Sequence, residues 1–260
     1  MKTPYSKFVF LSSVSDFKDS QVVILGVPWE SSTAIPGTRL APNRFREASW
    51  LIETYSPYQE RDLKDIRICD LGNLLLPPGK EDVLNKLRKE ISSLLKERKK
   101  FVLLGGDHSI TLGLMGVIPS RVKILHLDAH ADRRHQYRGD LFNHATVIRR
   151  LEEEGLRVQS VGVRSRTPEE VWEEVNIEER DEVYLSLDLD IFDPSQAPAV
   201  SNPEPGGWFF RDFLDWLDKL PPFNLIGFDI VELNPLLEGS HITAVMGAVL
   251  IRELILKFWG

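Results

Sequence analysis

Three polar clusters in the sequence combine aspartate and histidine at spacings that suit metal binding. Gly-Gly-Asp-His-Ser occupies 105–109, Asp-Ala-His-Ala-Asp occupies 128–132, and Asp-Leu-Asp occupies 188–190. In the second and third clusters the acidic and imidazole side chains alternate with other residues, so they can project to one side of an extended backbone. The candidate metal ligands are His108, Asp128, His130, Asp132, Asp188 and Asp190.

The chemistry of these side chains favours a pair of divalent ions. Aspartates crowded in a protein interior repel one another and lose hydration unless cations compensate, although a single aspartate can also cap a helix or a turn. About four negative charges balance two divalent ions, and oxygen and imidazole donors without thiolate favour Mn²⁺ over structural zinc. Two metal ions about 3.5–4 Å apart can hold a bridging hydroxide that is nucleophilic at neutral pH.

The elements that position these clusters are predicted from short apolar runs and from helical periodicity. Runs without polar alternation are typical of strands that are covered on both faces, as in a parallel sheet. The strands are expected at 21–27, 66–71, 101–104, 122–127, 157–163, 182–187 and 225–228. Helices are expected at 43–53 after Pro42, and at 81–98, 145–154 and 241–258.

Alternating strands and helices predict an α/β fold with a mainly parallel sheet, formed by a single domain over 1–260. In such sheets ligands bind at the carboxyl ends of the strands, and each of the three clusters follows a predicted strand. The segment 194–207, which is rich in Pro, Gly and Ser, is predicted to be an active-site loop.

Composition excludes several other classes of protein. The formal net charge is −7, so no global positive field exists to bind a nucleic acid. Cys69 is the single cysteine, which excludes an internal disulfide and a cysteine-based zinc cluster, and we expect it to be a core residue. No apolar stretch is long enough to cross a membrane, and residues 1–16 lack the order of a signal peptide. A cytoplasmic protein is expected.

The three clusters, with Ser-Leu-Asp-Leu-Asp-Ile-Phe-Asp-Pro at 186–194, resemble the signatures of the ureohydrolases, the arginase and agmatinase family. The resemblance covers nearly the whole chain. It implies an arginase-like three-layer α/β/α domain with two Mn²⁺ ions per chain. One ion would bind His108, Asp128, Asp132 and Asp188, and the other His130, Asp128, Asp188 and Asp190, so that Asp128 and Asp188 bridge.

Two further residues gain roles from the resemblance. His144 matches the histidine that relays a proton, and Glu232 matches the glutamate that holds the guanidinium of the substrate. These residue types suit the reaction, because a carboxylate can accept two hydrogen bonds from a guanidinium, and a histidine titrates near neutral pH. The implied reaction converts a guanidino compound to urea and an amine through a metal-bridging hydroxide.

The substrate is expected to be a small cationic guanidino compound. Pro-Glu-Pro-Gly-Gly at 203–207 and the sequence around His144 are more similar to prokaryotic agmatinases than to arginases, which implies that agmatine is converted to putrescine in polyamine biosynthesis. An N-substituted agmatine such as aminopropylagmatine fits equally. The cationic loop that contains Arg133, Arg134 and Arg138 instead suits a carboxylate, as in arginine or guanidinobutyrate, unless these arginines pair with Asp140 or point outward.

Other classes of function remain as alternatives. A deacetylase-like amidohydrolase would use one zinc ion, which does not need six ligands. A catalytically silent binding protein usually lacks a metal ligand or a catalytic residue. This chain keeps all six candidate metal ligands as well as His144 and Glu232. The family resemblance also implies a homo-oligomer, a trimer or a hexamer.

Five polar residues outside the proposed site have simpler expected roles. His126 is expected either to support the ligands from outside or to be a core histidine, and Asp107 to anchor backbone or ligands. Asp193 is expected to form a turn, His135 to be solvated, and His241 to lie in the first turn of the last helix.

Overall fold

The computed structural model describes residues 8–31 and 35–260. Its centre is a sheet of seven strands in the order β4-β1-β5-β9-β8-β6-β7, and every pair of neighbours is parallel. The strands are β1 (Val22–Gly26), β4 (Ile68–Asn73), β5 (Lys100–Leu104), β6 (Lys123–Leu127), β7 (Arg157–Val161), β8 (Glu182–Asp188) and β9 (Asn224–Val231). The expected mainly parallel sheet is confirmed, with each predicted strand in place.

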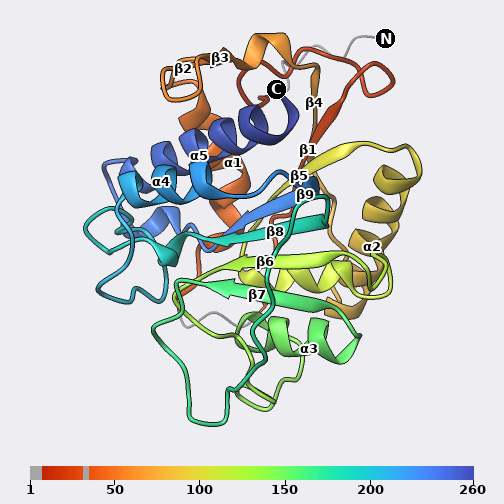
Figure 1. Cartoon of the computed structure of the whole chain (residues 1–260), viewed down its shortest axis with the longest axis vertical. Coiled ribbons are helices and arrows are strands. Elements are labelled where there is room, and N and C mark those ends of the chain that lie inside the picture. Colours follow the sequence, from red (N-terminus) through yellow and green to blue (C-terminus); the bar gives the residue numbers. More distant parts are fainter. Residues whose placement is uncertain (1–7, 32–34) are drawn as a thin grey trace.

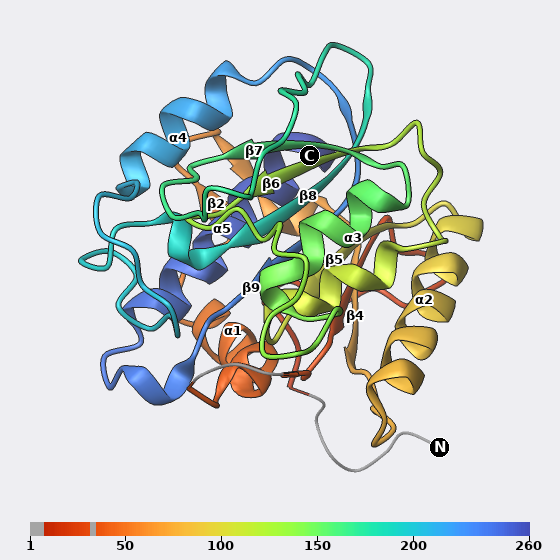
Figure 2. The ribbon, with the colours of Figure 1, turned by 90° about the horizontal axis from the view of Figure 1, so that it is seen from below.

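Helices cover both faces of this sheet (Figures 1 and 2). One face carries α1 (Ala41–Ser49), α4 (Phe210–Lys219) and α5 (Ile242–Trp259), and the other carries α2 (Lys80–Lys96) and α3 (Val147–Glu153). Successive strand residues point to opposite faces, so Val102 packs with the first group and Phe101 with the second. The core is therefore divided into two apolar layers, and the three-layer α/β/α architecture is confirmed.

Sequence patterns missed two elements and misplaced a helix end. The small hairpin β2 (Tyr55–Ser56) and β3 (Arg61–Asp62) was not predicted, because its strands are only two residues long. Helix α4 was also not predicted, although Phe213, Leu214 and Leu217 form its buried face. Helix α1 ends four residues before the predicted end. Short 3-10 helices lie at Thr38–Leu40, Leu63–Asp65, His108–Leu114, His144–Thr146, Leu189–Ile191 and Pro235–Leu237.

The centre of the sheet determines where chemistry can occur. The neighbouring strands β5, β9, β8 and β6 all end at the same edge, where the loops leave their carboxyl ends. Among the described residues no helix is long and apolar enough to span a bilayer. The single domain over 1–260 stays a prediction.

Candidate metal centre

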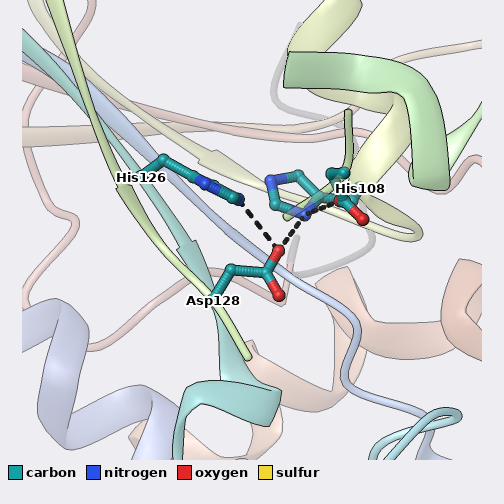
Figure 3. Close-up of side chains that lie close together, drawn as sticks. His108, His126 and Asp128 are labelled. Atoms are coloured by element: carbon teal, nitrogen blue, oxygen red, sulfur yellow. Dashed lines mark hydrogen bonds and ion pairs between the residues drawn. The ribbon is translucent and has the colours of Figure 1, made fainter. Parts of the chain in front are cut away.

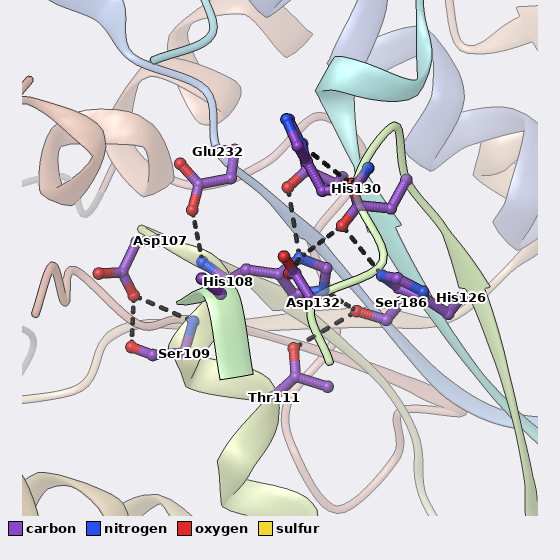
Figure 4. Close-up of polar contacts among 12 residues, drawn as sticks. Asp107, His108, Ser109, Thr111, His126, His130, Asp132, Ser186 and Glu232 are labelled. Carbon is purple, nitrogen blue, oxygen red and sulfur yellow. Dashed lines mark hydrogen bonds and ion pairs between the residues drawn. The ribbon is translucent and has the colours of Figure 1, made fainter. Parts of the chain in front are cut away.

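The central strands bring all six predicted ligands to one edge of the sheet. His108 begins the 3-10 helix that follows β5, and the cluster 128–132 directly follows β6. Asp188 ends β8, and Asp190 lies in the short 3-10 helix after it. Figure 4 shows His108, His130 and Asp132 converging there, with Glu232 close by at the end of β9.

His108 lies fully buried among three carboxylates. Its Nδ1 atom is 3.0 Å from Asp128 Oδ2 (Figure 3). It is also 3.2 Å from Asp132 Oδ2 and 3.3 Å from Asp188 Oδ2. Despite these distances, Nδ1 makes no hydrogen bond with any described residue. One imidazole nitrogen without a hydrogen bond and three carboxylate oxygens therefore converge, which is a set of donor atoms that suits a bound cation.

His130 forms a second group of donors. Its Nδ1 atom is 2.7 Å from Asp190 Oδ2 and 3.4 Å from Asp128 Oδ1. Ligand atoms of Asp128, His130 and Asp190 lie within 4.8 Å of one another, as do those of His108, His126, Asp128 and Asp132. Asp128 belongs to both groups, with one carboxylate oxygen toward each, so the geometry suits a bridging carboxylate.

The acidic groups shift one another's protonation strongly. Burial raises the pKa of Asp132 to about 7 and that of Asp190 to about 6, and the charge of Asp128 acts in the same direction. Burial and the charge of Asp190 also raise the pKa of Asp188 well above its usual range. Burial alone lowers the pKa of His130, but its contacts with Asp128 and Asp190 raise it to about 12. Without a metal ion, the raised pKa values mean that these carboxyl groups keep protons that offset their mutual repulsion. Bound divalent cations can replace the protons and compensate the negative charge instead.

We expect Mn²⁺ to raise the melting temperature more at pH 8 than at pH 6. The raised pKa values of Asp132 and Asp190 mean that both carboxyls bind more protons when folded, so their contribution to the stability of the metal-free protein falls as pH rises from about 4 toward those values. A cation must displace these protons, so it binds more tightly at higher pH. Calorimetry with and without Mn²⁺ measures the difference, and equal shifts at both pH values would contradict this account.

A buried hydrogen-bond network holds the far side of the His108 ring. Nε2 of His108 lies 2.9 Å from Ser186 Oγ, and Ser186 donates to Asp229 Oδ1 at 2.6 Å. Tyr184 and Thr111 donate to Asp229 Oδ2. The network favours the proton on Nε2 and leaves the Nδ1 lone pair for a metal ion. Sequence reasoning missed Ser186 and Asp229, although an aspartate inside the apolar strand β9 was an available signal.

His126 contacts the carboxylate of Asp128. Its Nε2 atom lies 2.9 Å from Asp128 Oδ2, and its Nδ1 atom lies 3.1 Å from Ser160 Oγ. Burial lowers the pKa of His126 to about 4, despite the hydrogen bond with Asp128. A neutral imidazole can donate one hydrogen bond to the carboxylate, which agrees with the expected supporting role (Figure 3).

Two site residues adopt left-handed backbone conformations. Asp132 has φ 52° and Glu232 has φ 66°, values that are uncommon for residues other than glycine. In this conformation Glu232 places Oε1 2.8 Å from the His108 backbone nitrogen, whose N–H it accepts. Burial and the charge of Asp107 raise the pKa of Glu232 well above its usual range. Strain of this kind at two positions of the site indicates that the surrounding fold fixes both residues.

His144 lines the same cavity as His130, Asp188 and Glu232. Asn143 and Thr146 form a capping box at the start of its 3-10 helix, which fixes the backbone at His144. The ring meets Tyr137 edge-on with centroids 5.4 Å apart, and Nδ1 is buried without a hydrogen bond to a described residue. Burial lowers the pKa of His144, so its imidazole is neutral at neutral pH and can accept or relay a proton.

These residues line a cavity of about 280 Å³. Its walls include six of the predicted site residues, namely His130, Asp132, His144, Asp188, Asp190 and Glu232. The 194–207 segment contributes Ser201 and Asn202, which agrees with its predicted place beside the site. A larger groove of about 960 Å³ lies near α5 and contains none of the candidate ligands.

The predicted charged loop behaves differently from the expectation. Arg133 is 2% exposed, forms an ion pair with Glu152 at 2.8 Å, and stacks on Trp172. It neither points outward nor pairs with Asp140, which instead contacts Lys80. The sequence could not show this, because the partners of Arg133 come from a distant helix and loop. Arg134 and Arg138 both lie over the Tyr137 ring, and Arg134 also lines the cavity.

The remaining polar residues have mainly structural roles. Asp107 accepts hydrogen bonds from the Ser31 and Ser109 backbone nitrogens, which fits an anchor. Asp193 accepts from the Ser195 and Gly206 backbone nitrogens, which fits a turn. His135 is exposed, as expected. His241 is not in the first turn of α5 but precedes it as the N-cap, in a left-handed conformation.

Comparison with known proteins agrees with this geometry. The model of the arginase family matches residues 20–178 and 169–257. The chain belongs to the arginase family. Within that family it is similar to prokaryotic agmatinases: it is 32% identical to an agmatinase from Bacillus anthracis, over 97% of each chain.

Two archaeal members of the arginase family extend the comparison. An agmatinase from Pyrococcus horikoshii is 34% identical, over 88% of this chain and 89% of its own. The crystal structure of the agmatine ureohydrolase of Thermoplasma volcanium superposes with a TM-score of 0.86 at 29% identity, covering 98% of this chain and 95% of that one. The present chain is thus an agmatinase-like hydrolase of the arginase family.

Proposed function

We propose that this protein is a binuclear manganese hydrolase that cleaves a guanidino compound to urea and an amine. Agmatine, which would give putrescine, is the first candidate substrate, and an N-substituted agmatine such as aminopropylagmatine is the next. The observation that carries the proposal is the convergence of two donor groups, which share Asp128, with Glu232 and His144 on one cavity of about 280 Å³.

One ion would be held by His108, Asp128, Asp132 and Asp188, and the other by His130, Asp128, Asp188 and Asp190. The orphaned Nδ1 of His108 and the all-oxygen-and-imidazole donor set support a hard divalent ion such as Mn²⁺. When bound, the ions would lower the pKa of a water molecule and so supply the nucleophile at neutral pH.

Glu232 would bind and orient the substrate. Its carboxylate lies in the cavity and already accepts the backbone N–H of His108, so one oxygen is fixed in position. A planar guanidinium can donate to such a carboxylate through its fork of N–H groups. This hydrogen bonding would hold the guanidinium carbon toward the metal ligands and limit its rotation. The positive charge of the substrate also compensates a carboxylate that burial disfavours.

His144 would deliver a proton to the amine that leaves. Its side chain lines the cavity, and its lowered pKa keeps a neutral imidazole available to pick up a proton near neutral pH. The leaving nitrogen must gain one proton as the carbon–nitrogen bond breaks. His144 would take up the proton that a water molecule loses as it becomes the nucleophile, and would pass it to this leaving nitrogen.

A urea-release assay tests the proposal directly. The full chain, loaded with Mn²⁺, is given agmatine, aminopropylagmatine, arginine and guanidinobutyrate at matched concentrations. We expect urea from agmatine or its N-substituted form, and no urea after metal removal by a chelator.

Metal analysis on the same sample separates the rival classes, since a single zinc ion per chain would favour a deacetylase-like amidohydrolase. A fully loaded protein that releases no urea from any compound would favour a catalytically silent binding protein.

A guanidino acid is a second candidate substrate. Arg134 and Arg166 both line the cavity, and neither forms an ion pair with a described carboxylate. Glu170, which also lines the cavity, already accepts backbone N–H groups from Arg133 and Thr167. These two cations would attract the carboxylate of guanidinobutyrate or arginine, but both are exposed and therefore screened. Faster turnover of either acid than of agmatine in the same assay would favour this alternative.

We also propose a homo-oligomer, a trimer or a hexamer, in the cytoplasm. The groove of about 960 Å³ near α5 is lined mainly by apolar side chains, including Tyr58 and Ile242, which are 52% and 53% exposed. Apolar surface of this extent is typical of contacts between proteins. Light scattering of the full chain measures the number of subunits.

A further inference from the structure

The two imidazoles of the proposed metal centre have different environments. His108 is fully buried, and the buried pair Ser186 and Asp229 holds its outer nitrogen. The His130 side chain is 19% exposed, and the residue lines the cavity. Whatever holds the His130 ring must therefore come from the loops at the surface.

The outer nitrogen of His130 contacts Asn202. Nε2 lies 2.9 Å from Asn202 Nδ2, the nitrogen end of the side-chain amide, while Nδ1 faces Asp190 and Asp128. A histidine that binds a metal through Nδ1 carries its proton on Nε2, and a partner that accepts this proton fixes both the tautomer and the ring orientation. The amide oxygen of Asn202 can serve as that acceptor, since the two ends of an amide are interchangeable by rotation about the last side-chain bond.

The backbone around Asn202 is held in place by β9 and the residues that follow it. Val200 pairs with Leu233 in an antiparallel bridge, and the Asn234 backbone N–H donates to the Ala199 oxygen at 2.8 Å. The Asn234 side-chain amide donates to Ser201 Oγ at 3.0 Å. Asn202 is therefore an exposed side chain on an anchored loop, and its contact with His130 is built into the fold.

We propose that Asn202 is a positioning residue for His130 and that it sets the affinity of the ion held by His130, Asp128, Asp188 and Asp190. This inference rests on the proposed metal centre. The ion on the His108 side keeps its buried support from Ser186 and Asp229 and does not depend on Asn202. The two metal positions thus differ in how firmly they are held, and the more exposed one depends on a single amide.

Titration calorimetry of Mn²⁺ into the metal-free full chain tests the proposal. We expect Asn202→Ala to weaken one of the two binding events about 10- to 100-fold and to leave the other unchanged, as is typical when the outer partner of a ligand is removed. Asn202→Asp keeps an acceptor for the Nε2 proton, so both events should stay within a few-fold of wild type. Asn85→Ala, an exposed asparagine on α2, is the matched control.

Electron paramagnetic resonance gives a second readout. At two equivalents of Mn²⁺ the wild type should show the broad signal of two interacting ions, and Asn202→Ala should show mainly the signal of a single ion. Wild-type affinity for both ions in Asn202→Ala would overturn the role of Asn202 and leave the proposed function standing, as would an equal loss in Asn202→Asp. Failure of the wild type to bind two ions would overturn both.

Discussion

Asp188→Asn is expected to abolish the binding of Mn²⁺ and to lower kcat/KM for urea release by about a thousand-fold or more. Asp188 ends β8 and lies 3.3 Å from His108 Nδ1, and it is assigned to both ions. An amide has nearly the same shape but lacks the charge that a bridging ligand needs. Without the metal ions, the transition state would lose several kcal/mol of stabilisation. Each 1.4 kcal/mol lost lowers the rate about tenfold.

The same substitution should stabilise the protein when no metal is bound. Burial and the charge of Asp190 raise the pKa of Asp188, so its ionised form is unfavourable in the fold. Replacing it with a neutral amide removes that repulsion, and each kcal/mol gained raises the melting temperature by about 2–4 °C. Asp215→Asn, an exposed carboxylate on α4, is the control. A metal-free Asp188→Asn protein that melts below the wild type would contradict the electrostatic account.

Glu232→Gln should lower kcat/KM about 10²- to 10⁴-fold while both metal ions remain bound. The change removes the charge that strengthens two hydrogen bonds to the guanidinium, each of which contributes about 1.5–3 kcal/mol. The amide oxygen can still accept the His108 N–H, so the backbone at the ligand is preserved. Steady-state urea release, together with Mn²⁺ analysis of the same sample, measures the effect.

The control for this substitution is Glu179→Gln, which changes an exposed glutamate whose side chain is 66% exposed. It should match the wild type in both readouts. If Glu232→Gln lost its metal ions, Glu232 would act on the metal centre and not on the substrate. If it kept both ions and full kcat/KM, the proposed contact with the guanidinium would be wrong.

Sequence patterns predicted the sheet well because its strands are buried on both faces. Runs such as Phe101–Leu104 contain only apolar residues, and a parallel sheet with helices on both faces is the fold that buries them. The candidate ligands were visible for a related reason. Asp128, His130 and Asp132 directly follow the largely apolar run 122–127, and charged residues at the end of a buried strand need a compensating partner.

Features that depend on contacts between distant segments were not visible in the sequence. Arg133 lies in a run of charges that is typical of a solvated loop, yet Glu152 and Trp172 bury it. The contact of Asn202 with His130 likewise joins segments 72 residues apart, and neither residue type nor spacing indicates it. The left-handed backbone at Glu232 was not predictable either, since the position itself is neither glycine nor asparagine.

The strand order has a consequence for how the site is assembled during synthesis. Strand β9 is the last in the chain but lies between β5 and β8, which carry His108 and Asp188. A nascent chain that has not yet released β9 from the ribosome therefore lacks the strand that separates and aligns these two halves. The proposed metal centre is therefore expected to form only when translation is nearly complete, and truncated products are expected not to bind the ions.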